Sequence, residues 1–127
     1  MSIKVVSTDK APAAIGPYSQ AVIASGMLYV SGQIPLVPAT GEIIEGGVAA
    51  QTRQVLDNMK EVVAAAGAGL GSVVKVTIYI TDMQQFSVVN EIYGTYFSEP
   101  FPARACVQVS ALPKGVEVEM DAIVQLG

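Results

Sequence analysis

The chain has 127 residues, with seven lysines and arginines against eleven aspartates and glutamates, and a formal net charge of −4. It is 51% hydrophobic and 14% charged, which excludes a disordered chain and predicts one domain spanning residues 1–127. Because histidine is absent, the sequence excludes a Ser-His-Asp triad, a Cys-His dyad and a histidine metal ligand or general base. The single cysteine, Cys106, excludes an internal disulfide and a cysteine-cluster metal site.

The net charge and the length of the apolar runs also limit the classes of partner that this chain is expected to bind. Phosphate binding needs clustered positive charge, which an acidic chain with only two arginines does not offer, so nucleic acid is not an expected partner. No apolar run reaches the roughly 18 residues of a membrane span, and residues 1–10 lack the apolar core of a signal peptide. We therefore expect a cytoplasmic protein without membrane contact, and an unpaired cysteine fits that reducing compartment.

Taken in chain order, the first third is predicted to consist of strands and loops. A short strand over 4–7 comes first, and strands over 20–24 and 27–33 form a hairpin around Ser25 and Gly26. Prolines interrupt the two remaining stretches, which are therefore predicted to be loops, over residues 11–18 and 35–47.

The middle of the chain is predicted to alternate helix and strand. Apolar residues at helical spacing indicate a helix over 48–66, and Gly67 follows as its C-terminal cap. Alternation of side chains between two faces indicates a strand over 73–81. Asp82 then caps a second helix over 84–98, which prolines end.

Two further strands, over 103–109 and 116–126, complete a β-β-β-α-β-α-β-β order. The even-numbered residues of 74–80 and 116–126 form an apolar face that the two helices can cover. The other face is predicted to mix polar and apolar side chains, which is typical of burial by another subunit, so we expect an oligomer. That face is predicted to carry Met27, Tyr29, Thr77, Tyr79, Arg104, Cys106, Gln108, Glu117, Glu119, Asp121 and Ile123.

Arg104 is the first candidate for chemistry. It lies between two alanines in a predicted strand, where an enclosed and unpaired guanidinium is strongly destabilising. It is therefore expected to pair either with Glu119 or Asp121 in a structural salt bridge, or with the carboxylate of a ligand. Composition alone favours the salt bridge. Arg53, the other arginine, is expected on the surface of the first helix.

Carboxylates recur at alternate positions of the last strand, so they are predicted to share one face. Glu117 is interpreted as a solvated side chain, whereas Glu119 lies nearer the strand centre and is the better candidate for acid–base chemistry. Cys106 is two residues from Arg104, whose charge favours a thiolate. Without an activating histidine, however, we interpret this cysteine as a small buried apolar residue.

Three further features each admit a ligand-binding and a structural interpretation. Tyr18 follows a proline in a loop, and its phenol either closes over a ligand or is an edge aromatic. Asn90 interrupts the apolar pattern of the second helix, and Ser31-Gly32 interrupts a strand, which marks close backbone approach or a bulge. Together these residues predict a small carboxylate-binding site without a cofactor or metal, and they leave the reaction open.

Several stretches resemble, in order and spacing, the reactive intermediate deaminase family of the RidA or YjgF type. The resemblance covers essentially the whole chain. It is carried by APAAIGPYSQ (11–20), SGQIPL (31–36), QTRQVLDNMK (51–60), VVKVTIYITDMQQFSVVNEIY (73–93) and PARACVQVSALPKGVEVEM (102–120).

The resemblance implies a chorismate-mutase-like α+β fold, with two helices packed on one face of a mixed sheet. It implies a homotrimer with a barrel-like core and active sites between adjacent subunits. It also implies hydrolysis of 2-imino acids, such as 2-iminobutanoate and 2-iminopropanoate, to 2-oxo acids and ammonia without a cofactor. Pyridoxal-phosphate-dependent serine and threonine dehydratases would supply these imines.

Residue roles follow from the same resemblance. Arg104 matches the arginine that holds the substrate carboxylate, and Glu119 matches the acidic residue that positions or activates water. The Cys106 position contributes mainly through its backbone. This sequence has Ala105 where many members have serine, and Ser110-Ala111 replaces a common small-Arg pair, which changes the charge at the rim. The matching pocket and rim positions are Tyr18, Ser31, Gly32, Asn90 and Pro113.

Other functions fit parts of the same pattern. A non-catalytic regulatory module that binds 2-oxo or imino acids would use the same pocket but would not need a water-activating Glu119. Chorismate mutase shares the fold, but its dianionic substrate calls for more cations than this chain offers. Endoribonuclease activity, ascribed to relatives, fits poorly with an acidic chain that lacks histidine.

Overall fold

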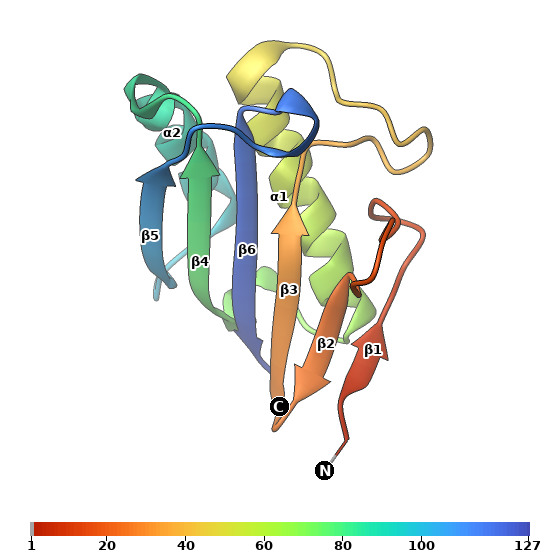
Figure 1. Cartoon of the computed structure of the whole chain (residues 1–127). Helices are drawn as coiled ribbons and strands as arrows, with labels where there is room; N and C mark the ends of the chain where they lie inside the picture. The colour runs from red at the N-terminus through yellow and green to blue at the C-terminus, as the bar shows by residue number, and fades with distance from the viewer. Residues whose placement is uncertain (1) are drawn as a thin grey trace.

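The computed structural model describes residues 2–127 and contains one six-stranded mixed sheet with two helices on one face (Figure 1). The strand order is β1-β2-β3-β6-β4-β5, in which β4 and β5 are parallel and all other neighbours are antiparallel. The predicted α+β class is therefore confirmed. The elements are β1 (Lys4–Val6), β2 (Ala21–Ala24), β3 (Met27–Gln33), α1 (Gly47–Ala65), β4 (Val73–Ile80), α2 (Phe86–Tyr96), β5 (Ala103–Gln108) and β6 (Val118–Gln125).

Local sequence signals account for the ends of several elements. Ser25 and Gly26 have φ values of 52° and 76°, the left-handed pair that a two-residue hairpin requires. Gly67, with φ 82°, follows the end of α1 as predicted. The Asp82 side chain accepts a hydrogen bond of 3.0 Å from the Gln84 amide, which caps a 3₁₀ turn ahead of α2. The second helix is therefore shorter than predicted, because its first expected turn is 3₁₀.

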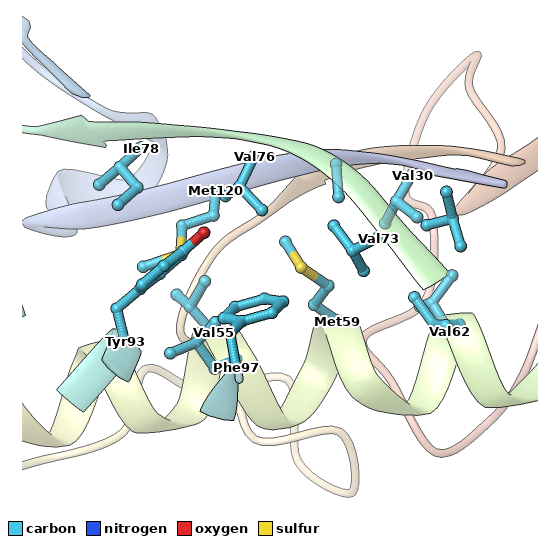
Figure 2. Close-up of a cluster of buried hydrophobic side chains, with 14 of the residues drawn as sticks. Val30, Val55, Met59, Val62, Val73, Val76, Ile78, Tyr93, Phe97 and Met120 are labelled. Carbon is cyan, nitrogen blue, oxygen red and sulfur yellow. The ribbon is translucent and has the colours of Figure 1, made fainter. Parts of the chain in front are cut away.

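The core lies between the two helices and the sheet (Figure 2). Alternate residues of β4 and β6 face the helices, as the apolar pattern predicts. Val74 is an exception: it was predicted on this face but is 38% exposed. The register of β4 against β6 shifts between Val73 and Lys75, and Val73 is buried in its place.

The second face of the sheet has no helix over it (Figure 1). We call it the open face. It is partly apolar, since Tyr29 and Val107 are each 43% exposed there. Within residues 2–127, neither helix has the length and apolar composition needed to cross a membrane.

The prediction that Arg104 lies on the open face is wrong. In the parallel β4–β5 pair, Arg104 is opposite Val76 and Cys106 is opposite Ile78. Residues that pair across a sheet point to the same side, and Val76 and Ile78 are buried under the helices. Cys106 and Gln108 are misplaced in the same way, and alanines and Val107 occupy the open face of β5 instead.

Candidate functional site

Arg104 extends from β5 toward α2, where three side chains surround its guanidinium. Nη1 donates a hydrogen bond of 2.7 Å to Asn90 Oδ1. The guanidinium carbon lies 4.9 Å from the centre of the Tyr93 ring and 5.3 Å from that of Phe86, within reach of cation–π attraction. The three helical residues lie four and three positions apart, so they share one side of α2. We call Phe86, Asn90, Tyr93 and Arg104 the Arg104 cluster.

These contacts contradict the predicted salt bridge between Arg104 and Glu119 or Asp121. The partners described above are an amide oxygen and two ring faces, all of them neutral. Asp121 instead accepts a hydrogen bond of 2.9 Å from the Tyr79 hydroxyl on the open face. These contacts therefore leave the positive charge of Arg104 unneutralised, in an exposed cavity that Asn90 and Tyr93 also line.

Cys106 lies beside Arg104 on the helix-facing side of β5 and packs against the core. Burial raises the pKa of its thiol, and the nearby Arg104 charge opposes this only in part. The thiol is therefore held protonated and apolar, as the second of our two interpretations predicts.

Glu119 lies at the other side of the sheet, in a cavity of about 390 Å³ that we call the Glu119 pocket. Gly32 makes room for its carboxylate, because a Cβ at that position would collide with it, 2.9 Å from the Glu119 carboxyl carbon. The β3–β6 register shifts between Val30 and Gln33, so Ser31-Gly32 forms the predicted bulge. The pocket is lined by Pro12, Ala13, Ile15, Tyr18, Gln20, Gly32, Gln33, Ile34, Leu36, Pro113, Lys114 and Glu119.

The surroundings of Glu119 strengthen its basicity. Burial raises the pKa of its carboxyl above the ordinary value, and the negative charge of Asp121 raises it further. Lys114, on the pocket wall, has a φ of 58° between Pro113 and Gly115, an uncommon left-handed conformation for a lysine. The pocket thus contains a carboxylate of increased proton affinity, and an exposed lysine also lines it.

Buried amides fix the walls of the Glu119 pocket. Gln20 is 5% exposed, and its Nε2 donates hydrogen bonds to the carbonyls of Thr8, Ala11 and Pro12 at 3.0, 3.3 and 2.8 Å. Asn58, from α1, donates from Nδ2 to the carbonyls of two further wall-loop residues, Ile34 and Leu36. The loops are therefore held in place by the rigid part of the fold.

Ser31 supports this wall and is not among the pocket's lining residues. Its hydroxyl donates to the Ser19 carbonyl, and its amide donates to the Gln20 carbonyl at 3.0 Å. Tyr18, which directly precedes Ser19 in this loop, is 54% exposed at the pocket. Ser31 therefore holds the Tyr18 loop.

The structure separates the predicted site residues into two groups. Tyr18, Gly32, Pro113 and Glu119 line one pocket, whereas Asn90 and Arg104 line a second cavity that shares no residue with it. The expectation that Arg104 and Glu119 lie on one face of the same chain is therefore wrong. Among residues 2–127, no group of three histidine, cysteine, aspartate or glutamate side chains is placed to hold a metal ion.

Sequence reasoning missed three residues of these two groups. Phe86 and Tyr93 are not among the residues that the sequence pattern singles out, yet their rings lie against Arg104. Lys114 was not singled out, although it lines the Glu119 pocket. The spacing of the two aromatic residues around Asn90 is a signal that identifies the first two, because it places all three on one side of a helix.

Comparison with known proteins identifies the family of this chain. A family model described as Endoribonuclease L-PSP matches residues 8–126, so the chain belongs to that family. Its fold is that of the RidA structures: RidA from the Antarctic bacterium Psychrobacter sp. PAMC 21119 is 48% identical, with a TM-score of 0.93 over 97% of this chain and 99% of that one. The resemblance stated from the sequence motifs is confirmed.

Two further relatives are similar over nearly their full length. The 2-iminobutanoate/2-iminopropanoate deaminase of Bos taurus is 51% identical over 98% of this chain and 90% of its own. The structure of E. coli TdcF with bound serine is 45% identical, with a TM-score of 0.92 over 98% of this chain and 99% of that one.

Proposed function

We propose that this chain hydrolyses small 2-imino acids, including 2-iminobutanoate and 2-iminopropanoate, to 2-oxo acids and ammonia. The name of the bovine relative supports the reaction at 51% identity. The structural observation that carries the proposal is the Arg104 guanidinium, which is held by neutral groups and so keeps its charge for a substrate carboxylate. Pyridoxal-phosphate-dependent serine and threonine dehydratases are the proposed source of the imines.

The proposed active site is assembled from two subunits of a homotrimer. A small 2-imino acid cannot touch Arg104 and Glu119 of one chain, because these side chains are on opposite faces of the sheet, on strands that β4 separates. The partly apolar open face and the outer edge of β5, with no paired strand within residues 2–127, supply surfaces for a neighbour. In this arrangement Arg104 of one subunit faces the Glu119 pocket of the next.

The proposed mechanism assigns one task to each group. Arg104 holds the substrate carboxylate, which orients the imine carbon toward a water molecule beside Glu119. Glu119 accepts a proton from that water as its oxygen bonds to the imine carbon, and the C=N electron pair moves to nitrogen. Return of that proton to nitrogen gives a carbinolamine, which carries a hydroxyl and an amino group on the same carbon. Glu119 then moves the hydroxyl proton to the amino nitrogen, so that the C–N bond breaks, ammonia leaves and the C=O bond forms. The raised pKa of Glu119 makes its carboxylate a stronger base for the first step.

The direct test uses an amino-acid oxidase to generate the imine in the presence of semicarbazide. The chain should speed the release of 2-oxo acid and ammonia and suppress formation of the semicarbazone. Arg104→Ala should lose this effect, whereas Arg53→Ala, at the other arginine, should keep it because Arg53 is exposed on α1. No acceleration by the wild-type protein would contradict the proposal.

The same assay separates the alternatives. A regulatory module would bind 2-oxobutanoate without changing the rate of imine hydrolysis. The family description also names an endoribonuclease. RNA cleavage is less well supported here, because the chain carries a net charge of −4 and no histidine. RNA cleavage that follows the pure protein and is lost in Glu119→Gln would reverse that ranking.

A further inference from the structure

We infer that Phe86 and Tyr93 are positioning residues, which fix the plane of the Arg104 guanidinium so that a carboxylate can dock on its edge. This inference rests on the proposed function, since it concerns how the proposed carboxylate-binding group is oriented. It concerns two aromatic rings on α2 that lie against Arg104.

The geometry restrains the guanidinium in two independent ways. The rings of Phe86 and Tyr93 lie against it at 5.3 and 4.9 Å from the guanidinium carbon, which restricts its tilt. Asn90 accepts the 2.7 Å hydrogen bond from Nη1, which restricts rotation within the plane. Arg104 itself is exposed, so without these contacts its long side chain would sample many rotamers.

The neutrality of these contacts suits a ligand-binding arginine. A carboxylate beside Arg104 would hold it equally well but would compete with the substrate for the same N–H donors. Ring faces attract the cation without using any N–H donor, and Asn90 occupies only Nη1. The remaining donors stay available for a bidentate carboxylate, which needs a planar and correctly oriented fork.

The contribution of Tyr93 lies in its ring and not in its hydroxyl group. The side chain is 4% exposed, and its hydroxyl oxygen is buried without a hydrogen-bond partner among residues 2–127. Figure 2 shows this ring reaching into the core, with Phe97 nearby. Phenylalanine at this position therefore keeps the face that lies against Arg104, whereas leucine removes it.

The test compares four variants by nuclear magnetic resonance and by calorimetry. Phe86→Leu and Tyr93→Leu remove one ring each, and Tyr93→Phe keeps the ring. Ile92→Ala truncates a buried residue of the same helix that belongs to the core and not to the Arg104 cluster, so it controls for lost stability. The readouts are the side-chain Nε–Hε signal of Arg104 in ¹⁵N-arginine-labelled protein and the Kd for 2-oxobutanoate.

Because the chain has only two arginines, the spectrum contains one further side-chain signal, from Arg53, as an internal reference. Ring currents should shift the Arg104 signal in the wild type, in Tyr93→Phe and in Ile92→Ala. Phe86→Leu and Tyr93→Leu should move it toward the position of an unstacked arginine and weaken 2-oxobutanoate binding about tenfold. In steady-state kinetics with an oxidase-generated imine, the loss of activity in Phe86→Leu and in Tyr93→Leu should appear mainly as a higher KM, with a smaller change in kcat.

Two results would overturn the inference. The first is an Arg104 signal that does not respond to loss of either ring. The second is a Kd that stays at the wild-type value in Phe86→Leu and Tyr93→Leu, or that rises as much in Ile92→Ala. If the wild-type protein neither binds 2-oxobutanoate nor hydrolyses imines, the proposed function fails, and the ring-current shift still decides whether the stacking exists.

Discussion

The Arg104 cluster and the Glu119 pocket each contain one charged side chain, of opposite sign, in a different physical environment. Arg104 is exposed and held by neutral groups, so its full charge and its donor geometry remain available. Glu119 is half-buried against a glycine and near a second carboxylate, so its affinity for protons is raised. This difference matches the roles that we propose, substrate binding for Arg104 and proton transfer for Glu119, and the two roles can be tested by separate substitutions.

The largest expected effect is on the binding side. Arg104→Ala removes the proposed bidentate, charge-assisted pair of hydrogen bonds to the substrate, so kcat/KM should fall about 100-fold or more. In Arg104→Lys, kcat/KM should fall nearly as far, because an ammonium group cannot reproduce the planar, forked geometry of the guanidinium. Steady-state kinetics with an oxidase-generated imine measure both. Activity close to wild type in Arg104→Lys would show that the charge matters and the geometry does not.

The second effect concerns proton transfer. Glu119→Gln keeps the shape of the side chain but removes the base, so kcat should fall about 100-fold. The Kd for 2-oxobutanoate, measured by calorimetry, should change by less than about threefold, because in the proposed mechanism the carboxylate acts on water and not on the ligand's carboxyl group. Equal losses in kcat and in binding would assign Glu119 a structural role.

A third change acts on the Glu119 pocket through the backbone. In Gly32→Ala the new Cβ collides with the Glu119 carboxylate, which must move away. A displacement of about 1 Å at a reacting group costs up to about 100-fold in rate, so we expect a loss of about tenfold or more. Gly71→Ala is the matched control, because a Cβ there meets no atom within 4 Å. An unchanged kcat in Gly32→Ala would show that the close approach is irrelevant to the reaction.

The smallest effect is a shift in the acid limb of the pH–kcat profile. Glu119 acts as a base only when ionised, so kcat should fall as the pH falls through its raised pKa. Asp121→Asn removes the negative charge that helps to raise this pKa, so the limb should move to lower pH. Tyr79→Phe removes a hydroxyl group and keeps the Asp121 charge, so it should leave the limb in place. A shift to higher pH in Asp121→Asn would contradict the account.

The helix-covered face was the most predictable part of the fold, because burial by the chain's own helices imposes an alternating apolar pattern on β4 and β6. The misassignment of Val74 came from a local register shift, which alternation alone does not reveal. The misplacement of Arg104 came from the edge strand β5, where alanines and a cysteine give no clear pattern. Its facing was decided by pairing with β4, a non-local contact.

In the candidate site, too, local features could be predicted from the sequence and features that depend on non-local contacts could not. Ser31-Gly32 was readable as a close approach or a bulge, and the structure shows both. The partner of Arg104 was predicted wrongly, because composition favoured a salt bridge and carries no signal for the neutral groups that contact the guanidinium. The aromatic rings beside it came from α2, and only the fold brings them to β5. The raised pKa of Glu119 depends on its burial in the same way.

The central claim is that Arg104 and Glu119 of one active site belong to different subunits. Arg104→Ala and Glu119→Gln, each inactive alone, can be unfolded together, refolded as a mixture and assayed. In a ring of three subunits, random mixing gives intact sites wherever a subunit that keeps Arg104 faces one that keeps Glu119. The account therefore predicts recovery of about a quarter of wild-type activity from an equal mixture. A mixture no more active than the separate variants, in particles shown to contain both, would contradict it.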